Sequence, residues 1–378
     1  MASDAKGFNL KNLNLSFLRA KELVGVDIGS STIKFLFLKG SPGKYSVQKW
    51  GIETIGSNGS QEVSTESRKE EVIKTLKQIV KEHALANKKV ATSISGNSVI
   101  VRYVKFPKLS PQDLKLSIQF EAEPYIPFDI RDVNISFHIL NDVIDEGQKK
   151  METVLVAAKS DFIYSKINIL KSVGLKPSVV DVDSFALESA YECIHDSNLP
   201  ETVLIVNIGA SVTNMTIIEN GISRVVRDVF ISGNSITKVL QKNLQCSFQE
   251  AEDLKKKYGI LVTVEDKDRA LSEDNKESIQ ISNIMFPVLK DIISEVQRSL
   301  DFYLSQGSDK TINRILLCGG TSKLKNISNF FSQELKMPVE ALNPFLRIRG
   351  ADKIPSDIAS SFVIALGLAT RKSGDSII

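Results

Sequence analysis

Three short segments place glycine beside hydroxyl side chains, a combination that suits the binding of phosphate groups. They are residues 27–31 (DIGSS), 207–213 (NIGASVT) and 318–322 (CGGTS). Glycine lets backbone N–H groups approach an anion closely, and serine or threonine adds further hydrogen-bond donors. One such turn alone often only reverses a hairpin, so the prediction of a polyphosphate site rests on all three together.

Two charged side chains could complete the first turn. Lys34 lies seven residues after Asp27, on the strand that leaves the turn, so its ammonium group could reach back to a phosphate. Asp27 could hold Mg²⁺ directly or through water, because magnesium prefers oxygen ligands. We therefore expect the first turn to bind a phosphate together with its metal.

The first two turns belong to a repeated pattern. An apolar strand runs into a glycine turn at 23–29 and again at 202–209, and a second strand follows each turn. The third turn lies between a strand at 313–318 and a helix at 324–335, where its glycines would let the backbone pack against an adenosine. Because this pattern of strand, glycine turn and strand recurs about half a chain later, the sequence predicts two α/β lobes with a cleft between them.

A strand is predicted at 90–95, and the residues after it are predicted to form a separate unit. A strand at 99–106, a helix at 110–124 that Ser110 and Pro111 would begin, and strands at 133–140 and 154–159 predict a small α+β subdomain. In the second half, 262–277 is predicted to be a charged loop and 281–305 a long amphipathic helix. The predicted domains are a tail (1–22), a first lobe (23–89, 161–200 and 346–378), an inserted subdomain (90–160), and a second lobe (201–232 and 311–345) with its own subdomain (233–310).

Composition narrows the class of protein. The 378 residues include 48 Lys and Arg against 45 Asp and Glu, a formal net charge of +3, which gives no basic face for nucleic acid. The three cysteines form no Cys-x-x-Cys pair and the three histidines no metal-spaced pair, so neither a disulfide framework nor a zinc site is expected.

No apolar run reaches the roughly 18 to 20 residues that a membrane span needs. The tail is not a signal peptide, and its segment 8–18 is either an amphipathic helix or a partly ordered tail.

Several motifs along the chain, taken in order, resemble those of a known superfamily. The order DIGSSTIK (27–34), DVDSFALESAY (181–191), NIGASVTN (207–214), AEDLKKKYG (251–259) and CGGTSKL (318–324) is similar to that of the actin, heat-shock chaperone and FtsA ATPases. The stretch KFPKLSPQDLKLSIQFEAEPYIPFDI (105–130), with ALNPF (341–345) and ALGLATR (365–371), resembles more narrowly the PilM family of type IV pilus assembly proteins. The resemblance covers nearly the whole chain from Leu23. It implies a two-lobed, actin-like (ribonuclease H-like) ATPase fold of the α/β class, with ATP or ADP and Mg²⁺ as ligands.

The resemblance also implies the residues of the site. Asp183 falls where relatives place a Glu or Gln that orients the attacking water, and Asn207 falls where they usually have Asp. An amide binds Mg²⁺ and its waters less strongly than a carboxylate, so we expect nucleotide binding with weak or absent ATP hydrolysis. The residues expected to bind the nucleotide are Asp27, Gly29, Ser30, Ser31, Lys34, Asn207, Gly209, Ala210, Ser211, Thr213, Gly233, Glu252, Lys255, Gly319, Gly320 and Thr321.

A partner follows from the same resemblance. PilM-like proteins capture a cytoplasmic N-terminal peptide of the inner-membrane protein PilN in a groove between the first lobe and the inserted subdomain. This implies a cytoplasmic protein at the inner face of the inner membrane, attached through PilN to the PilN/PilO complex and acting in twitching motility. Tyr125, Ile126 and Phe128 are groove candidates, although a place in the subdomain core is the favoured interpretation. Residues 12–15 (NLNL) leave self-docking or a homodimer open.

Three alternatives remain at this stage. A true ATPase would use hydrolysis to drive assembly. A filament-forming or cell-division protein like FtsA would usually carry a C-terminal amphipathic membrane helix, and residues 371–378 are too short and polar for one. A sugar kinase of the same superfold would need a catalytic Asp in a sugar pocket, and none stands out.

Overall fold

The computed structural model describes residues 22–56, 65–195 and 199–374. The expectations for the tail 1–22, including segment 8–18, therefore lie outside the described residues, except at Glu22.

The first sheet has the strand order β3-β2-β1-β4-β8. Its strands are β1 (Val24–Ile28), β2 (Thr32–Lys39), β3 (Ser46–Thr54), β4 (Lys89–Ile94) and β8 (Lys176–Val182). β1, β2 and β3 are antiparallel neighbours, whereas β1, β4 and β8 run parallel, so the carboxyl ends of these three meet at one edge. Helices α1 (Thr65–Glu82) and α3 (Ser160–Ser172) bury apolar side chains against one face of the sheet.

The second sheet repeats this layout, as the sequence echo predicted. Its order is β11-β10-β9-β12-β13, in which β9 and β10 form a hairpin and β9, β12 and β13 run parallel. The predicted turn at Asn220 and Gly221 joins β10 to β11, with φ angles of 50° and 83°. The strands are β9 (Thr202–Ile208), β10 (Thr213–Glu219), β11 (Ile222–Val229), β12 (Arg314–Cys318) and β13 (Val339–Ala341). One face is covered by α5 (Gly233–Leu244), α6 (Phe248–Tyr258), α8 (Lys276–Leu304) and α9 (Ile327–Leu335).

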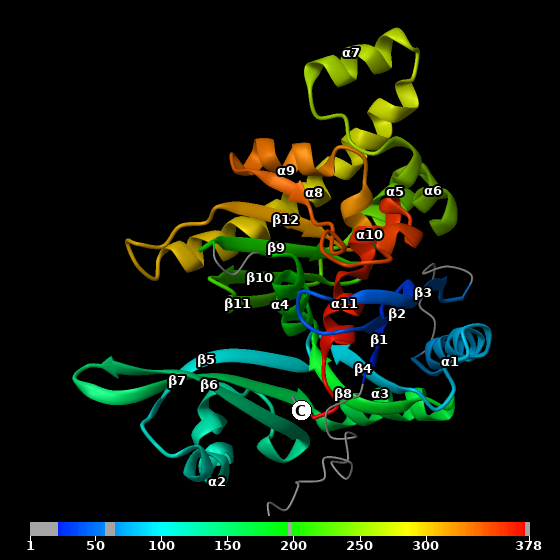
Figure 1. The fold of residues 1–378 in the computed structure, drawn as a ribbon. Coiled ribbons are helices and arrows are strands. Elements are labelled where there is room, and N and C mark those ends of the chain that lie inside the picture. The colour runs from blue at the N-terminus through cyan, green and yellow to red at the C-terminus, as the bar shows by residue number, and fades with distance from the viewer. Residues whose placement is uncertain (1–21, 57–64, 196–198, 375–378) are drawn as a thin grey trace, which may run out of the picture.

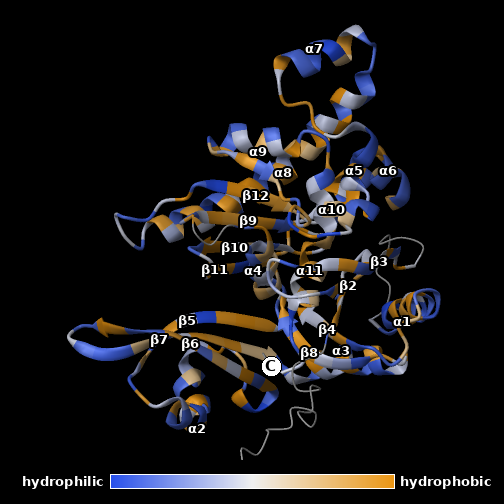
Figure 2. Cartoon of the chain, viewed as in Figure 1, coloured by the Kyte–Doolittle hydropathy of each residue, from blue (hydrophilic) through white to orange (hydrophobic). Residues whose placement is uncertain are grey.

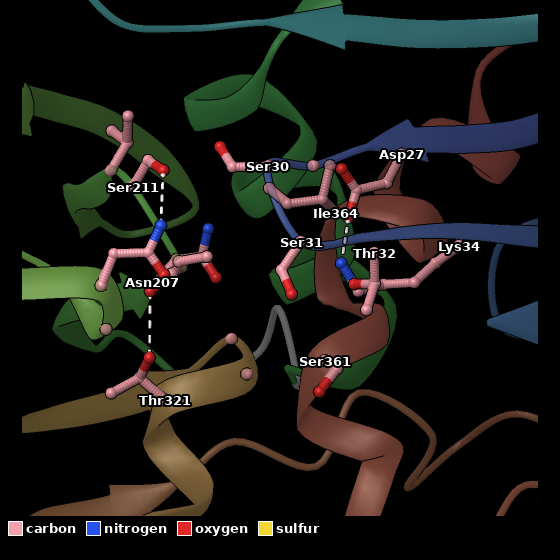
Figure 3. Close-up of a pocket in the computed structure, with 18 of the residues that line it drawn as sticks. Asp27, Ser30, Ser31, Thr32, Lys34, Asn207, Ser211, Thr321, Ser361 and Ile364 are labelled. Carbon is pink, nitrogen blue, oxygen red and sulfur yellow. Dashed lines mark hydrogen bonds and ion pairs between the residues drawn. The ribbon is translucent and has the colours of Figure 1, made fainter. Parts of the chain in front are cut away.

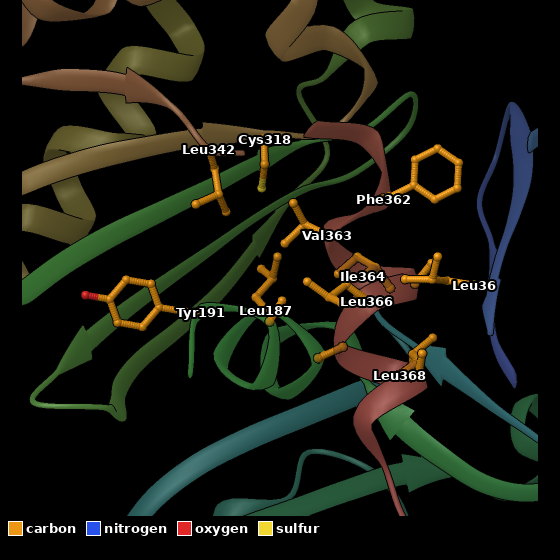
Figure 4. Close-up of a cluster of buried hydrophobic side chains, with 14 of the residues drawn as sticks. Leu36, Leu187, Tyr191, Cys318, Leu342, Phe362, Val363, Ile364, Leu366 and Leu368 are labelled. Atoms are coloured by element: carbon orange, nitrogen blue, oxygen red, sulfur yellow. The ribbon is translucent and has the colours of Figure 1, made fainter. Parts of the chain in front are cut away.

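Two helices lie between the sheets (Figure 1). α4 (Asp183–Ile194) leads from β8 to the second sheet, and α11 (Val363–Thr370) follows the short helix α10 (Ser356–Ala359) back to the first. Their apolar side chains share one core with residues of both sheets, among them Leu36 of β2 and Cys318 of β12 (Figure 4). In Figure 2 the central strands β9 and β12 are coloured mainly as hydrophobic, which fits strands that are buried on both faces. The central core therefore joins the two lobes through α4 and α11.

The inserted subdomain contains the predicted order of strand, helix, strand and strand. Its elements are β5 (Val99–Pro107), α2 (Pro111–Ala122), β6 (Val133–Asp145) and β7 (Gln148–Lys159). The strands form a separate antiparallel sheet in the order β5-β7-β6, with the apolar side of α2 packed on it. Because residues 89–94 form β4 of the first sheet, the inserted sheet begins at Val99 and the predicted start at residue 90 was too early.

The groove candidates divide between core and surface. Ile126 is buried in the core of the inserted subdomain, and Phe128 packs against that core, in agreement with the favoured interpretation. Tyr125 does not belong to the core: 40% of its surface is exposed, while its ring meets Phe106 edge to face.

One prediction about the second lobe was wrong. Residues 262–277, expected as a charged loop, contain helix α7 (Val264–Ser272). Thr263 and Asp266 form a capping box, which satisfies the first N–H groups of the helix, and Ala270 is its one buried residue. α7 projects away from the sheets at the top of Figure 1, where an amphipathic pattern is not needed. The long helix α8 also begins earlier than predicted, after Asn275, whose side chain caps it.

Within the part of the chain that the structure describes, each helix is too short or too polar to span a bilayer.

Candidate functional site

The two sheets direct their strand ends into one cleft of about 720 Å³. From the first sheet come the loop after β1, Ser93 and Ser95 at the end of β4, and Asp183 after β8. From the second come the loop after β9 and the turn after β12. The carboxyl ends of parallel strands are the usual place for a ligand in α/β sheets, and here both halves contribute them. Figure 3 shows the first-lobe side chains opposite those of the second lobe.

The first glycine turn is closed by a hydrogen bond from the Gly29 N–H to the carbonyl of Thr32 (3.1 Å). Asp27 and Lys34 are cross-strand neighbours on β1 and β2, and their side chains form an ion pair of 3.0 Å. Both side chains are only slightly exposed, at 14% and 12%. Only one oxygen of Asp27 accepts the hydrogen bond from Lys34, so its second oxygen remains for a hydrated Mg²⁺. Carboxylate oxygen is a ligand that suits this metal.

The second glycine turn has the same closure. The Gly209 N–H donates to the carbonyl of Val212 (3.0 Å), and a Cβ atom on Gly209 would lie 2.7 Å from that oxygen. The N-terminus of α5 approaches this turn, because the Gly233 N–H donates to the Gly209 carbonyl (3.1 Å). A Cβ atom on Gly233 would lie 2.4 Å from the hydroxyl oxygen of Thr321. Only glycine fits at these two positions without displacement of the turn.

The third turn approaches the second from β12. Thr321 donates its hydroxyl hydrogen to the Gly209 carbonyl (3.0 Å). Gly319 has φ of 87°, and a Cβ atom there would lie 2.6 Å from the side-chain oxygen of Asn207. By contrast, no atom lies within 4 Å of a Cβ atom built on Gly320. This turn therefore presents open backbone to the cleft at Gly320.

Glu252 and Lys255 form an ion pair of 2.5 Å on one face of α6, as their spacing predicted. Lys255 also donates to the Gly233 carbonyl (3.2 Å) and to the hydroxyl of Thr237 (2.9 Å). Burial lowers the pKa of Lys255, and the neighbouring Glu252 opposes that shift. Burial tends to raise the pKa of Glu252, but the charge and hydrogen bond of Lys255 outweigh it and hold that pKa below its usual value. The pair ties α6 to the start of α5 beside the cleft.

Asp183 lines the cleft near Asp27, at the end formed by the first glycine turn. Burial, and then the negative charge of Asp27, raise the pKa of Asp183 to about 6, against the opposing effects of Ser93, Ser95 and Lys166. A carboxyl group with this pKa titrates near neutral pH, which is a property of proton-transfer sites.

A chain of hydrogen bonds leads from the cleft to the entry of the inserted subdomain. Asn207 Nδ2 donates to Asn214 Oδ1 (2.8 Å), and Asn214 Nδ2 donates to Asp228 Oδ1 (2.8 Å). The second oxygen of Asp228 accepts the backbone N–H of Gly96 (2.7 Å). Gly96 lies between β4 and β5, so the chain joins the second lobe to the first strand of the insert.

The structure brings together all but one of the residues predicted for the site. Thr213 does not line the cleft, because its buried hydroxyl donates to the carbonyl of Ile231 (2.8 Å). The next residue, Asn214, faces the cleft instead, as the alternation along a strand requires. The predicted residues that line it are Asp27, Gly29, Ser30, Ser31, Lys34, Asp183, Asn207, Gly209, Ala210, Ser211, Gly233, Glu252, Lys255, Gly319, Gly320 and Thr321.

Sequence reasoning missed further polar residues of the cleft. They are Thr32, Thr54, Ser93, Ser95, Lys166, Asn214, Asn234, Gln249, Lys256, Lys323, Asp357 and Ser361. Ser93 and Ser95 could have been found, since they end a strand parallel to β1. Lys166 has no such signal, because it comes from helix α3.

Comparisons with known proteins agree with this architecture. A family model described as type IV pilus assembly protein PilM matches residues 25–373. A solved PilM–PilN type IV pilus biogenesis complex superposes with a TM-score of 0.77 at 24% identity, over 93% of this chain and 98% of that one. The ethanolamine utilization protein EutJ from Carboxydothermus hydrogenoformans superposes with a TM-score of 0.52 at 16% identity, over 92% and 89% of the two chains. The cell division protein FtsA of Pseudomonas aeruginosa is 23% identical over 94% of this chain and 91% of its own length. The predicted actin-like fold is thereby confirmed.

Proposed function

Because the chain belongs to the PilM family of type IV pilus assembly proteins, we propose that it is a nucleotide-binding scaffold of the pilus assembly machinery. The observation that carries the proposal is the cleft between two glycine hairpins, one from each lobe. The turns after β1 and β9 would hold the phosphates of ATP or ADP through backbone N–H groups and the hydroxyls of Ser30, Ser31 and Ser211. The open backbone at Gly320 would lie against the nucleoside.

Within this site each charged group has a separate task. Lys34 would turn from Asp27 toward a phosphate and supply a point charge. Asp27 would hold the waters of Mg²⁺, which offsets the charge of the phosphates when it is bound. The Glu252–Lys255 pair would fix the N-terminus of α5 beside the ribose. Asn207 supplies no charge, which favours binding with little hydrolysis over efficient turnover.

Calorimetric titration with ADP or ATP in the presence of Mg²⁺ tests the nucleotide site. We expect binding by the wild-type chain and a loss of about 10- to 100-fold in affinity for Lys34→Met, because a charge-assisted phosphate contact is removed. Lys39→Met is the matched control, since Lys39 is exposed at the far end of the same strand and should keep wild-type affinity. Absence of any heat of binding with the wild-type chain would contradict the nucleotide proposal.

The proposed partner is the cytoplasmic N-terminal peptide of PilN, in a groove between the first lobe and the inserted subdomain. The superposed PilM structure was solved as a complex with PilN, which supports this partner. Through PilN the chain would join the PilN/PilO complex at the cytoplasmic face of the inner membrane and serve twitching motility.

The hydrogen-bond chain from Asn207 to Gly96 supports a nucleotide-modulated mode of peptide binding. At one end of this chain Asn207 and Asn214 face the proposed phosphates. At the other end Gly96 precedes the first strand of the insert. An ion pair of 3.3 Å between Arg224 of β11 and Glu152 of β7 adds a second contact between the second lobe and the insert. A ligand that moves one lobe against the other must therefore act on the inserted subdomain as well.

Asp228→Asn should uncouple the two sites. The wild-type carboxylate accepts hydrogen bonds with both oxygens, whereas an amide can accept with only one. If ADP changes the affinity of the wild-type chain for the PilN peptide by about tenfold, a typical coupling, the variant should show a change of less than about twofold. Fluorescence anisotropy of a labelled peptide, with and without ADP, gives both values. Asp291→Asn, on the exposed face of α8, is the control, and an unchanged ratio in Asp228→Asn would refute the uncoupling.

A further inference from the structure

Lys166 is a cation of the cleft that comes from outside the glycine turns. It lies on α3, its side chain lines the cleft, and its ammonium group donates to the backbone carbonyl of Ser93 at the end of β4 (2.9 Å). Among the described residues this is the one hydrogen bond that the ammonium group makes, although it carries three N–H donors. Two donors are therefore left for a ligand in the cleft.

The neighbours of Lys166 are the two carboxylates at the phosphate end, Asp27 and Asp183. Among the described residues neither carboxylate forms a direct ion pair with Lys166, and the Asp27 side chain pairs instead with Lys34 (3.0 Å). Burial lowers the pKa of Lys166, and the charges of Asp183 and Asp27 oppose that shift. Two lysines thus balance two carboxylates from opposite sides, Lys34 from β2 and Lys166 from α3.

The balance of charge between the two lysines and the two carboxylates affects how the cleft would bind a polyphosphate. A cleft with two unbalanced carboxylates would repel a nucleotide until a divalent cation entered with it, because like charges in a partly buried site repel strongly. Here the phosphate end is close to neutral from its own side chains. A hydrogen-bonding ammonium group with two free donors is also a suitable phosphate ligand.

We propose that Lys166 contacts the terminal phosphate of the bound nucleoside di- or triphosphate and so reduces the dependence of nucleotide binding on a divalent cation. The inference rests on the proposed nucleotide site and adds to it a specific ligand and a specific property. A purely structural alternative is that Lys166 only ties α3 to β4 through Ser93. The two roles differ in what happens when the metal is removed.

The test is calorimetric titration with ADP in buffer with Mg²⁺ and in buffer with EDTA, on the full chain. For the wild-type protein we expect EDTA to lower the affinity by less than about tenfold. For Lys166→Gln we expect a modest loss with Mg²⁺ and a loss of about 100-fold or more in EDTA, because Lys34 then faces Asp27, Asp183 and the phosphates without Lys166 or a divalent cation to offset their charge. Lys166→Arg keeps the charge and should restore most of the binding in EDTA. Lys171→Gln, an exposed lysine of the same helix, should match the wild type in both buffers.

Several results would overturn the proposal. Equal factors of loss on EDTA addition in wild type and Lys166→Gln would leave Lys166 with a structural role only. If Lys166→Gln fails to fold, the wild-type titration alone decides, since a loss above about tenfold in EDTA contradicts a built-in cation. If the wild-type chain binds no ADP even with Mg²⁺, the nucleotide site itself fails and this inference fails with it. Normal binding with Mg²⁺ but no difference between the variants removes the inference alone.

Discussion

Gly367→Val should lower the free energy of unfolding by about 3 kcal/mol or more, a large part of the stability of a typical protein. A Cβ atom on Gly367 would lie 1.8 Å from the carbonyl oxygen of Ala186 and 2.6 Å from its carbonyl carbon. The clash is with the backbone of α4, so no side-chain rotation can relieve it. The two helices would have to separate, and the core that joins the lobes would open.

Thermal and urea unfolding followed by circular dichroism measure this effect. Gly320→Ala is the matched control, because no atom lies within 4 Å of its added Cβ, and its stability should stay within about 0.5 kcal/mol of wild type. A change of less than about 1 kcal/mol for Gly367→Val would show that α4 and α11 do not cross as closely as described.

Much of the fold can be predicted from local signals in the sequence. Both lobes, their hairpins and the glycine turns follow from local signals, because an apolar strand, a glycine and a second strand are contiguous in the chain. The echo of 23–29 at 202–209 then places the two turns in equivalent positions, and the structure places them on opposite sides of one cleft. Helix α2 begins at Pro111 after its Ser110 cap for the same local reason.

Other features depend on contacts that are distant in the sequence. Lys166 reaches the cleft only because α3 packs beneath the first sheet and its side chain extends to Ser93, 73 residues earlier. The bond between Asp228 and Gly96 likewise joins residues 132 positions apart. Thr213 was assigned to the site by motif, but the pairing of Asn207 with Asn214 turns Thr213 to the other face. Helix α7 was missed for a different reason: its capping box is a local signal, but the helix buries only Ala270 and is rich in charged residues.

Asp183→Asn should raise the free energy of unfolding at pH 7.5 by about 2 kcal/mol, even though it removes a candidate catalytic group. The folded-state pKa of Asp183 is about 6, above its ordinary value of 3.8. A difference of this size corresponds to about 3 kcal/mol, and partial exposure to the cleft reduces it to about 2 kcal/mol. The carboxylate also gains about 0.5 kcal/mol from the N-terminus of α4, which is too small to reverse the sign.

The pH dependence of the stability difference between Asp183→Asn and wild type identifies its cause. Because the folded-state pKa is raised, ionised Asp183 destabilises the fold above pH 6, and the penalty declines as the pH falls from 6 toward 3.8. The advantage of Asp183→Asn over wild type, measured by urea unfolding, should therefore fall to about half between pH 7.5 and pH 5. Asp268→Asn, at an exposed position of α7, should show no advantage at either pH. A variant whose advantage did not change with pH would owe it to packing, and the buried charge of Asp183 beside Asp27 would no longer account for it.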